Sequence, residues 1–474
     1  MNLNDARAPS AALTHSFERQ CRARDTGPAL DLHARLSALK TLDSLLRANA
    51  DALCTAVDHD FKGRASQETR LLEIFPALEA IRHARRHLKH WMKPQARSTN
   101  IWFLPGRSRV LYQPLGVVGV VAPWNYPVYL AIGPVVSALA AGNRVLVKMS
   151  EAAPATGELL ERLVAQHFDA QRLAVINGDP DVAREFVALP FDHLLFTGST
   201  EVGRHVMRAA AANLTPVTLE LGGKSPAIVG RGIDVAEAAD RILFGKCLNA
   251  GQTCVAPDYA LIPEERIEAF AAAARLTVAK LYPRLRDNTD YTAIINERHR
   301  ERLAGYLDEA RVKGARVEEL NPGWENLAGS PKMAPHLVFG ATGAMRVMRE
   351  EIFGPILPLI PYRTLDEAIA FVNTRPRPLA LYVFDHDRAT IERVLAETVS
   401  GGVTVNETIL HLAQDELPFG GVGASGMGEY HGRAGFETFS KRKAVFFQSR
   451  FNALKLFRPP YGARFERLLK LLAR

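Results

Sequence analysis

Short strand-like runs alternate with helix-like segments between residues 117 and 198, and this alternation restricts the fold more than any other feature of the chain. Strands are predicted at Val117–Val121, Arg144–Lys148, Leu173–Asn177 and His193–Phe196, and helices at Val128–Ala141 and Pro154–His167. Such βαβ units build a parallel sheet that is open to ligands at the carboxyl ends of its strands. After about Leu219 a second set begins, with strands at Ala227–Val229 and Tyr259–Ile262 and helices over 235–249 and 264–281.

One stretch has the length of a membrane span, because residues 111–142 contain no charged side chain. Four prolines interrupt it, at positions 114, 123, 127 and 134. Proline lacks an N–H donor and breaks most helices, which would leave backbone groups unpaired in lipid. We therefore predict a buried strand, a loop and a buried helix here.

Composition is that of an ordinary globular protein. The 474 residues are enough for two to four domains, and the 47% hydrophobic and 23% charged fractions argue against disorder. Four cysteines cannot form a disulfide framework at this length, and Met1–Gln20 lacks an apolar signal core. A cytoplasmic location is expected.

The positive charge lies at the end of the chain. The net charge is +8, and residues 440–474 contain ten Lys or Arg against the single acid Glu466. A nucleic-acid groove across the body is therefore not expected. Residues 463–474 predict a short basic amphipathic helix with Phe465, Leu468, Leu469 and Leu472 on one face. It would either pack on the body or a partner subunit, which we favour, or lie on an anionic membrane surface.

Two segments before the alternating region have their own patterns. Residues 29–58 and 66–92 have the apolar spacing of packed amphipathic helices. Residues 99–113 predict a β-hairpin around a turn at Pro105-Gly106.

Cys254 and Glu220 are the first candidates for chemistry. Cys254 lies in Gly-Gln-Thr-Cys, which suits an exposed turn, although a lone cysteine is most often a small buried apolar residue. Glu220 ends an apolar strand and precedes two glycines. It is either a partly desolvated carboxylate that can take a proton from water or the ion-pair partner of Lys224.

Two loops provide further candidates. Asn125 lies between Pro123 and Pro127, where its amide would donate to an oxyanion or to its own turn. The segment 196–203 (FTGSTEVG) follows a strand and opens a helix, without the G-x-G-x-x-G pattern. It is a capped turn that would also favour a pyrophosphate at the helix N-terminus.

Together these segments resemble the aldehyde dehydrogenase superfamily over nearly the whole chain. The motifs that carry the resemblance are PWNYP (123–127), VLVKMSE (145–151), FTGSTEVGR (196–204), LELGGKSP (219–226), GQTC (251–254), EEIFGP (350–355) and LPFGGVGASGMG (417–428). The interval of 34 residues between Glu220 and Cys254 also matches the family.

The resemblance implies oxidation of an aldehyde to its carboxylic acid with a nicotinamide cofactor. Cys254 would attack the carbonyl, and Asn125 with the Cys254 backbone N–H would hold the oxyanion of the thiohemiacetal. After hydride transfer, Glu220 would activate the water that hydrolyses the thioester. No metal site is expected.

The resemblance also implies the cofactor-binding residues, which are Trp124, Lys148, Glu151, Gly198, Ser199, Gly203, Leu221, Gly222, Glu351 and Phe353. Glu151 would repel a 2′-phosphate and slightly favours NAD, whereas Lys148 favours NADP. Without the family context, Lys148 and Glu151 would be a surface ion pair.

The implied architecture is α/β, with a Rossmann-like cofactor domain, an α/β catalytic domain and a small β bridging element. The cofactor domain is expected over 1–98 and 112–218, the catalytic domain over 219–424, the bridging element over 99–111 and 436–450, and a basic tail over 451–474. The bridging element implies a homodimer, since it covers strand edges.

Details around GQTC resemble the class 3 branch, which includes enzymes for aromatic and fatty aldehydes. The expected substrate is coniferyl aldehyde, oxidised to ferulate, or a similar aromatic aldehyde. The alternative is a medium- or long-chain fatty aldehyde dehydrogenase at a membrane surface. A CoA-acylating relative has no need of the Glu220 base, and a non-enzymatic scaffold has no need of Cys254, Glu220 and Asn125 together.

Overall fold

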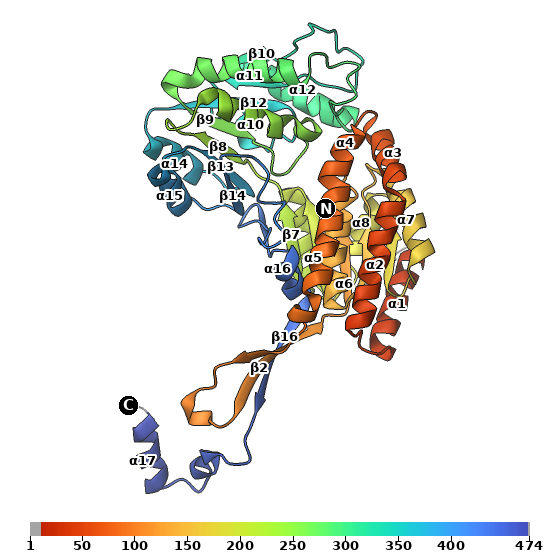
Figure 1. Ribbon diagram of the computed structural model, residues 1–474, viewed down its shortest axis with the longest axis vertical. Helices are drawn as coiled ribbons and strands as arrows, with labels where there is room; N and C mark the ends of the chain where they lie inside the picture. The colour runs from red at the N-terminus through yellow and green to blue at the C-terminus, as the bar shows by residue number, and fades with distance from the viewer. Residues whose placement is uncertain (1–10, 473–474) are drawn as a thin grey trace.

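A computed structural model describes residues 11–472, in which the strands form three separate sheets (Figure 1). Residues 1–10, the first half of the segment that was expected to lack a signal core, lie outside the described part, as do residues 473–474 of the tail. The α/β class with parallel-sheet units, predicted from the alternating pattern, is confirmed.

The six-stranded sheet contains the region of strict alternation. Its order is β15-β7-β6-β3-β4-β5, with β15 antiparallel to β7 and the other pairs parallel. The strands are β3 (Val117–Val121), β4 (Arg144–Lys148), β5 (Leu173–Ile176), β6 (His193–Gly198), β7 (Val217–Leu221) and β15 (Gly426–Met427). The predicted bounds of the first two are confirmed.

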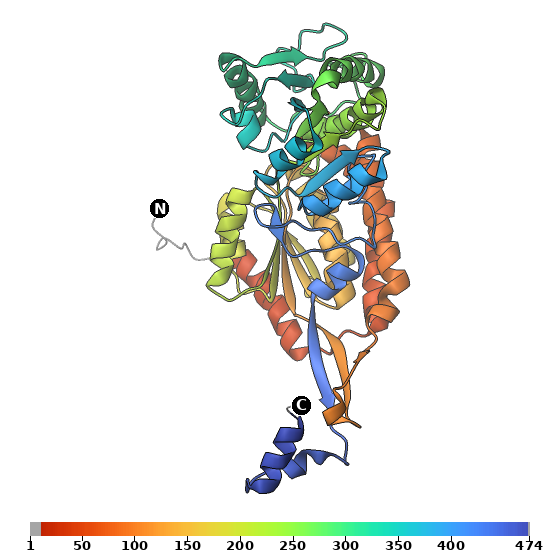
Figure 2. The ribbon, with the colours of Figure 1, turned by 90° about the vertical axis from the view of Figure 1, so that its left-hand side faces the viewer.

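Helices cover both faces of this sheet (Figure 2). One face carries α1 (Ala11–Thr26), α8 (Pro180–Val187) and α9 (Thr200–Ala211). The other carries α2 (Leu32–Ala48), α3 (Ala50–Phe61), α5 (Phe75–Trp91), α6 (Tyr129–Ala141) and α7 (Pro154–His167). Every residue of α6 is buried, which confirms that the charge-free stretch belongs to a protein core.

The predicted helix over residues 29–58 is divided at Asn49, where α2 ends and α3 begins. The Asn49 side chain donates to the Leu45 carbonyl, which ends the hydrogen-bond ladder of α2. The predicted helix over 66–92 begins with α4 (Ser66–Thr69) and one π-helical turn, η1 (Arg70–Ile74), before α5. Such π turns are frequent at functional sites.

The seven-stranded sheet has the order β10-β11-β12-β9-β8-β13-β14, antiparallel only between β10 and β11. Its strands are β8 (Pro226–Val229), β9 (Tyr259–Pro263), β10 (Arg316–Glu319), β11 (His336–Phe339), β12 (Ile356–Tyr362), β13 (Ala380–Phe384) and β14 (Gly402–Val405). The helices of this region are α10 (Val235–Cys247), α11 (Ile267–Leu281), α12 (Glu297–Val312), α13 (Arg346–Arg349), α14 (Leu365–Asn373) and α15 (Arg388–Glu397).

The third sheet forms an arm that projects from the body (Figure 2). It contains β1 (Gln95–Arg97), β2 (Arg107–Pro114) and β16 (Ser440–Phe447), in the order β1-β2-β16, all antiparallel. The predicted first hairpin strand at 99–104 is wrong, since residues 101–103 form a 3₁₀ turn and β1 lies further upstream. The Asn100 side chain accepts from the Trp102 N–H, which favours the turn over a strand.

The chain leaves β16, which follows α16 (Gly432–Thr438), and ends in η5 (Ala453–Phe457) and α17 (Ala463–Leu472). Both views place α17 beyond the arm, away from the two large sheets, so it does not pack on the body. Phe465 instead contacts the rings of Phe457 and Tyr461. The side chain of Leu472 lies outside the described part. Among the described residues, no helix is both long and apolar enough to cross a membrane.

Candidate active site

Three segments at the meeting of the two large sheets bring the predicted catalytic residues together. Asn125 follows β3, Glu220 lies near the end of β7, and Cys254 precedes β9. The Asn125 amide reaches the carbonyl of Gln252, two residues before Cys254, and the charge of Glu220 acts on the pKa of the Cys254 thiol. The three side chains therefore belong to one site.

The turn before Cys254 has an unusual backbone. After α10, η3 (Leu248–Gly251) contains Asn249, Ala250 and Gly251 in succession with positive φ values of 51°, 51° and 73°. A Cβ at Gly251 would lie 2.3 Å from the carbonyl oxygen of Gly354, so the close approach requires glycine. This packing holds the segment that carries Cys254 in a single conformation.

The Cys254 thiol is protonated at neutral pH in this state. The residue is only partly exposed, and burial, followed by the negative charges of Glu351 and Glu220, raises the thiol pKa to about 12. No lysine, arginine or histidine is among the causes that act on this thiol.

Glu220 is 3% exposed on β7, between Thr197 of β6 and Gly426 of β15. Both its carboxylate oxygens lack a hydrogen-bond partner among the described residues. Burial, followed by the charge of Glu429, raises its pKa well above the usual range. A carboxyl group in this setting is able to take up a proton from water.

The alternative that pairs Glu220 with Lys224 is wrong. The Lys224 ammonium forms an ion pair with Asp258 and donates to the carbonyls of Val347 and Glu350, at 2.8 and 3.0 Å. Lys224 therefore ties the end of β7 to the segment before Glu351 and leaves Glu220 unpaired.

Asn125 is buried, and its Nδ2 donates to the Gln252 carbonyl at 3.1 Å. It thus bonds across to the cysteine segment and not to its own turn, the alternative considered from sequence. An amide nitrogen carries two N–H groups, so this bond leaves a second donor for an oxyanion.

A buried network that sequence analysis missed supports Asn125. Arg64 donates to the Asn125 carbonyl at 2.8 Å and lies 3.3 Å from the Glu73 carboxylate, both ionic side chains being fully buried. Glu73 lies in the π turn and accepts from the N–H groups of Val128 and Tyr129, at the start of α6. The Asn249 amide also donates to the Asn125 carbonyl.

Glu68 performs the same role for the cysteine turn, since it accepts from the Asn249 N–H and the Thr292 hydroxyl. Charged residues in amphipathic helices are usually exposed, so the sequence pattern contains no sign that Arg64, Glu68 and Glu73 are buried.

Four predicted cofactor residues gather beside Cys254. The Glu351 carboxylate accepts from the Gly223 N–H and lies so close to Gly222 that a Cβ there would be 1.9 Å from Oε2. Burial and Asp258 raise the pKa of Glu351 to about 8. The ring of Phe353, whose φ is 49°, packs edge-on against Trp124 at 5.3 Å.

The second group lies where β6 passes into α9. Gly198 ends the strand, and Ser199 is exposed and caps the helix by accepting from the Val202 N–H. A Cβ at Gly203 would lie 2.5 Å from Leu221 Cδ2, so this glycine lets α9 pack closely on β7. The Thr197 hydroxyl, directly before the turn, is buried without a partner among the described residues.

Lys148 and Glu151 are not a surface ion pair. Lys148 is 1% exposed at the end of β4, and its ammonium donates to the carbonyls of Met149 and Gly178 at 2.7 and 2.8 Å. Burial lowers its pKa. Glu151 is exposed just beyond the end of β4, at the same edge of the sheet.

These features fit a dinucleotide. An exposed helix N-terminus follows the end of β6, a buried hydroxyl without a partner among the described residues lies beside it, and Lys148 ends β4 at the same edge of the sheet. These residues indicate where a dinucleotide would lie.

The chain belongs to the aldehyde dehydrogenase family, since residues 7–445 match the model described as "Aldehyde dehydrogenase family". Members of this family oxidise aldehydes with NAD or NADP. The resemblance found in the sequence is thus confirmed.

Within the family, the chain is similar to proteins named for one substrate. It is 55% identical over 97% of its length, and 96% of the relative, to a probable coniferyl aldehyde dehydrogenase of Pseudomonas aeruginosa. It is 47% identical over 100% of its length, and 98% of the relative, to the coniferyl aldehyde dehydrogenase of Pseudomonas sp. strain HR199. A 4,4'-diaponeurosporen-aldehyde dehydrogenase of Staphylococcus aureus is 39% identical over 93% of this chain and 95% of the relative.

Solved structures confirm the fold. The substrate-bound AldH of Staphylococcus aureus superposes with a TM-score of 0.91 at 37% identity, covering 97% of this chain and 99% of that one. The aldehyde dehydrogenase of Mycobacterium tuberculosis in complex with NAD⁺ gives a TM-score of 0.85 at 28% identity, covering 94% and 92%.

Proposed function

We propose that the protein oxidises coniferyl aldehyde, or an aromatic aldehyde of similar shape, to the carboxylic acid. The unpartnered Glu220 carboxyl beside the Cys254 thiol is the observation that carries the reaction. A buried acid without a hydrogen-bond partner destabilises the folded protein, and such groups are concentrated at catalytic sites. The substrate rests on the full-length similarity to proteins named for coniferyl aldehyde.

In the proposed mechanism the Cys254 sulfur attacks the aldehyde carbon, and the thiol proton passes to water. The free amide N–H of Asn125 and the Cys254 backbone N–H then donate to the oxyanion. Arg64 and Asn249 both donate to the backbone carbonyl of Asn125. These bonds hold the residue in place, so that its side-chain amide is oriented before charge develops.

We propose NAD as the preferred cofactor, held by the ten cofactor-binding residues that the sequence predicts, from Trp124 to Phe353. A bound oxidised nicotinamide would supply the acceptor for the hydride that the substrate carbon loses. The exposed carboxylate of Glu151 favours NAD, because it would repel a 2′-phosphate.

Glu220 then takes a proton from water, and the hydroxide attacks the thioester carbonyl and expels the Cys254 thiolate. The raised pKa makes the carboxyl a stronger base once it is ionised. This role argues against a CoA-acylating enzyme, in which CoA would replace water as the acceptor of the acyl group.

The test is the formation of NADH or NADPH by the purified protein with coniferaldehyde, benzaldehyde and decanal. We expect the highest kcat/KM with coniferaldehyde and NAD, and no product with Cys254→Ala. A clear preference for decanal would instead support the second candidate, a fatty aldehyde dehydrogenase at a membrane surface.

The observation that favours the second candidate is the exposed basic helix α17 at the end of the arm. We favour its packing on a partner subunit, in a homodimer joined by the element of residues 99–111 and 436–450. We further propose that residues 1–98 and 112–218 form the cofactor domain and residues 219–424 the catalytic domain.

A further inference from the structure

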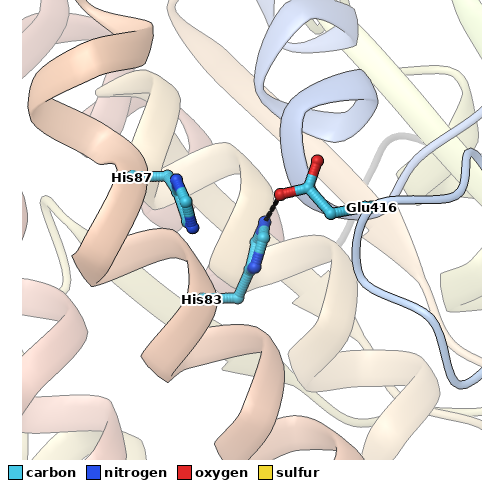
Figure 3. Close-up of side chains that lie close together, drawn as sticks. All are labelled: His83, His87 and Glu416. Atoms are coloured by element: carbon cyan, nitrogen blue, oxygen red, sulfur yellow. Dashed lines mark ion pairs between the residues drawn. The ribbon is translucent and has the colours of Figure 1, made fainter.

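Two histidines and a carboxylate meet beside α5 (Figure 3). His83 and His87 are one helical turn apart and point in the same direction, and Glu416 reaches them from the segment between β14 and β15. Among the described residues, this is a group in which one ligand atom of each side chain lies within 4.8 Å of the other two.

The contact between His83 and Glu416 lacks a hydrogen bond. Nε2 of His83 lies 3.2 Å from Oε1 of Glu416, yet it has no hydrogen-bond partner among the described residues. A cation between Nε2 of His83 and the Glu416 carboxylate would give both atoms a partner.

Packing fixes the direction of both rings. The His83 and His87 rings lie 4.5 Å apart, and the His87 ring stacks on Trp91 at 6.0 Å and 19°. The lack of a side chain at Gly432 leaves space beside Nε2 of His83, since a Cβ there would lie 3.3 Å from that nitrogen. Glu416 is by contrast 71% exposed in its side chain and is free to adjust.

The charges around the cluster favour a cation. The carboxylates of Glu79, Asp415 and Glu416 lie close enough for their charges to act on one another. Arg86 and the neighbouring ring of His87 are the positive groups beside His83, and Arg82 is paired with Glu79. The acidic groups therefore outweigh the unpaired arginine.

We propose that His83, His87 and Glu416 bind a divalent transition-metal ion such as Zn²⁺. Two imidazole nitrogens, one carboxylate oxygen and a water complete the tetrahedral set that Zn²⁺ prefers. Bonds of about 2.0–2.2 Å place the ligand atoms closer than they are here, and the exposed Glu416 side chain supplies the movement. The ion would join α5 to the segment that leads into β15, next to Glu220 on β7.

The test is isothermal titration of the full-length protein with Zn²⁺, in a Cys254→Ser background that removes the partly exposed active-site thiol as a second metal ligand. We expect one equivalent of Zn²⁺ to be lost from the stoichiometry with His87→Gln, or its affinity to fall by more than about 100-fold, since losing a ligand exceeds the 10–100-fold cost of losing an outer-shell partner. Glu416→Gln should weaken the same equivalent.

His90→Gln is the matched control, because His90 lies exposed on the same helix but outside the cluster. It should bind as the parent does. A second measurement guards against misfolding: Zn²⁺ should raise the melting temperature of the parent and of His90→Gln, but not of a folded His87→Gln. Equal stoichiometry and affinity in His87→Gln and His90→Gln would overturn the proposal and leave an ordinary His83–Glu416 contact.

Discussion

At the scale of single residues, Glu220 carries a cost that depends on pH. Its pKa is raised in the folded protein, whereas it ionises near its usual value in the unfolded chain. Below about pH 4.3 the group is protonated in both states, and the stability of the folded protein is not reduced by it. As the pH rises toward the folded-state pKa, that stability is progressively lost, because the unfolded chain ionises Glu220 more readily.

We predict that Glu220→Gln is more stable than the parent at pH 8 by about 1 kcal/mol or more, with the difference closing near pH 4.5. Thermal unfolding at the two pH values measures it, with the exposed Glu392→Gln as the control. A stability difference that is the same at both pH values would contradict the assignment.

The protonated state of Cys254 is also a prediction about a single residue. Glu351, with a pKa of about 8, is mostly charged at pH 9, where its charge opposes formation of the Cys254 thiolate. Glu351→Gln should therefore lower the thiol pKa and speed alkylation of Cys254 by iodoacetamide at pH 9 severalfold, and less at pH 7, where Glu351 is mostly protonated.

Mass spectrometry of the peptide that contains Cys254 follows this alkylation in the protein without cofactor. Glu350→Gln is the matched control. Glu350 is paired with Arg346, and its charge is not among those that shift the pKa of the Cys254 thiol. Slower or unchanged alkylation in Glu351→Gln would show that its charge does not reach the thiol.

At the same scale, sequence identified the candidate residues but not what holds them. Cys254, Glu220 and Asn125 could be named as candidates because each lies in a motif that carries the family resemblance. Arg64, Glu68 and Glu73 could not, because a charged residue in a helix pattern gives no sign of the fold that buries it. Only the tertiary structure brings Arg64 and α4 against the Asn125 and Cys254 segments.

At the scale of elements, the packing of α9 on β7 determines where the helix N-terminus lies. A side chain at Gly203 would displace Leu221 or move the helix. We predict that Gly203→Val raises KM for NAD about tenfold, the equivalent of about 1.4 kcal/mol of overpacking, with a smaller change in kcat.

Gly305→Ala is the matched control, since Gly305 lies in α12 with open space around its Cα. It should leave KM unchanged and stabilise the protein by about 1 kcal/mol through helix propensity. An unchanged KM for NAD in a folded Gly203→Val variant would show that the packing of α9 on β7 does not affect cofactor binding.

Elements with a strong period were predicted closely, and local side-chain bonds explain the errors. Strands β3 and β4 have the predicted bounds because their apolar runs are buried on both faces. The errors at Asn49 and at residues 99–104 share one cause. In both places an asparagine side chain bonds the backbone and ends or replaces the regular element.

At the scale of the whole molecule, the arm exposes apolar surface that a monomer would leave in water. Residues Ile101, Trp102, Phe103 and Leu104 are between 43% and 72% exposed in succession. Contiguous apolar patches of this kind mark interfaces.

We predict a dimer by analytical ultracentrifugation at micromolar concentration, and a monomer for Ile101→Asp combined with Trp102→Asp. Val312→Asp, at an exposed and isolated position at the end of α12, is the control and should remain dimeric. A parent protein that sediments as a monomer would contradict the assembly.

The central claim is that Cys254 forms the acyl-enzyme and Glu220 releases it. The most direct measurement is stopped-flow formation of NADH by Glu220→Gln with coniferaldehyde and NAD. The account predicts a burst of about one NADH for each active site, followed by turnover at least about 100-fold slower than in the parent. Multiple turnovers at the parent rate would contradict it.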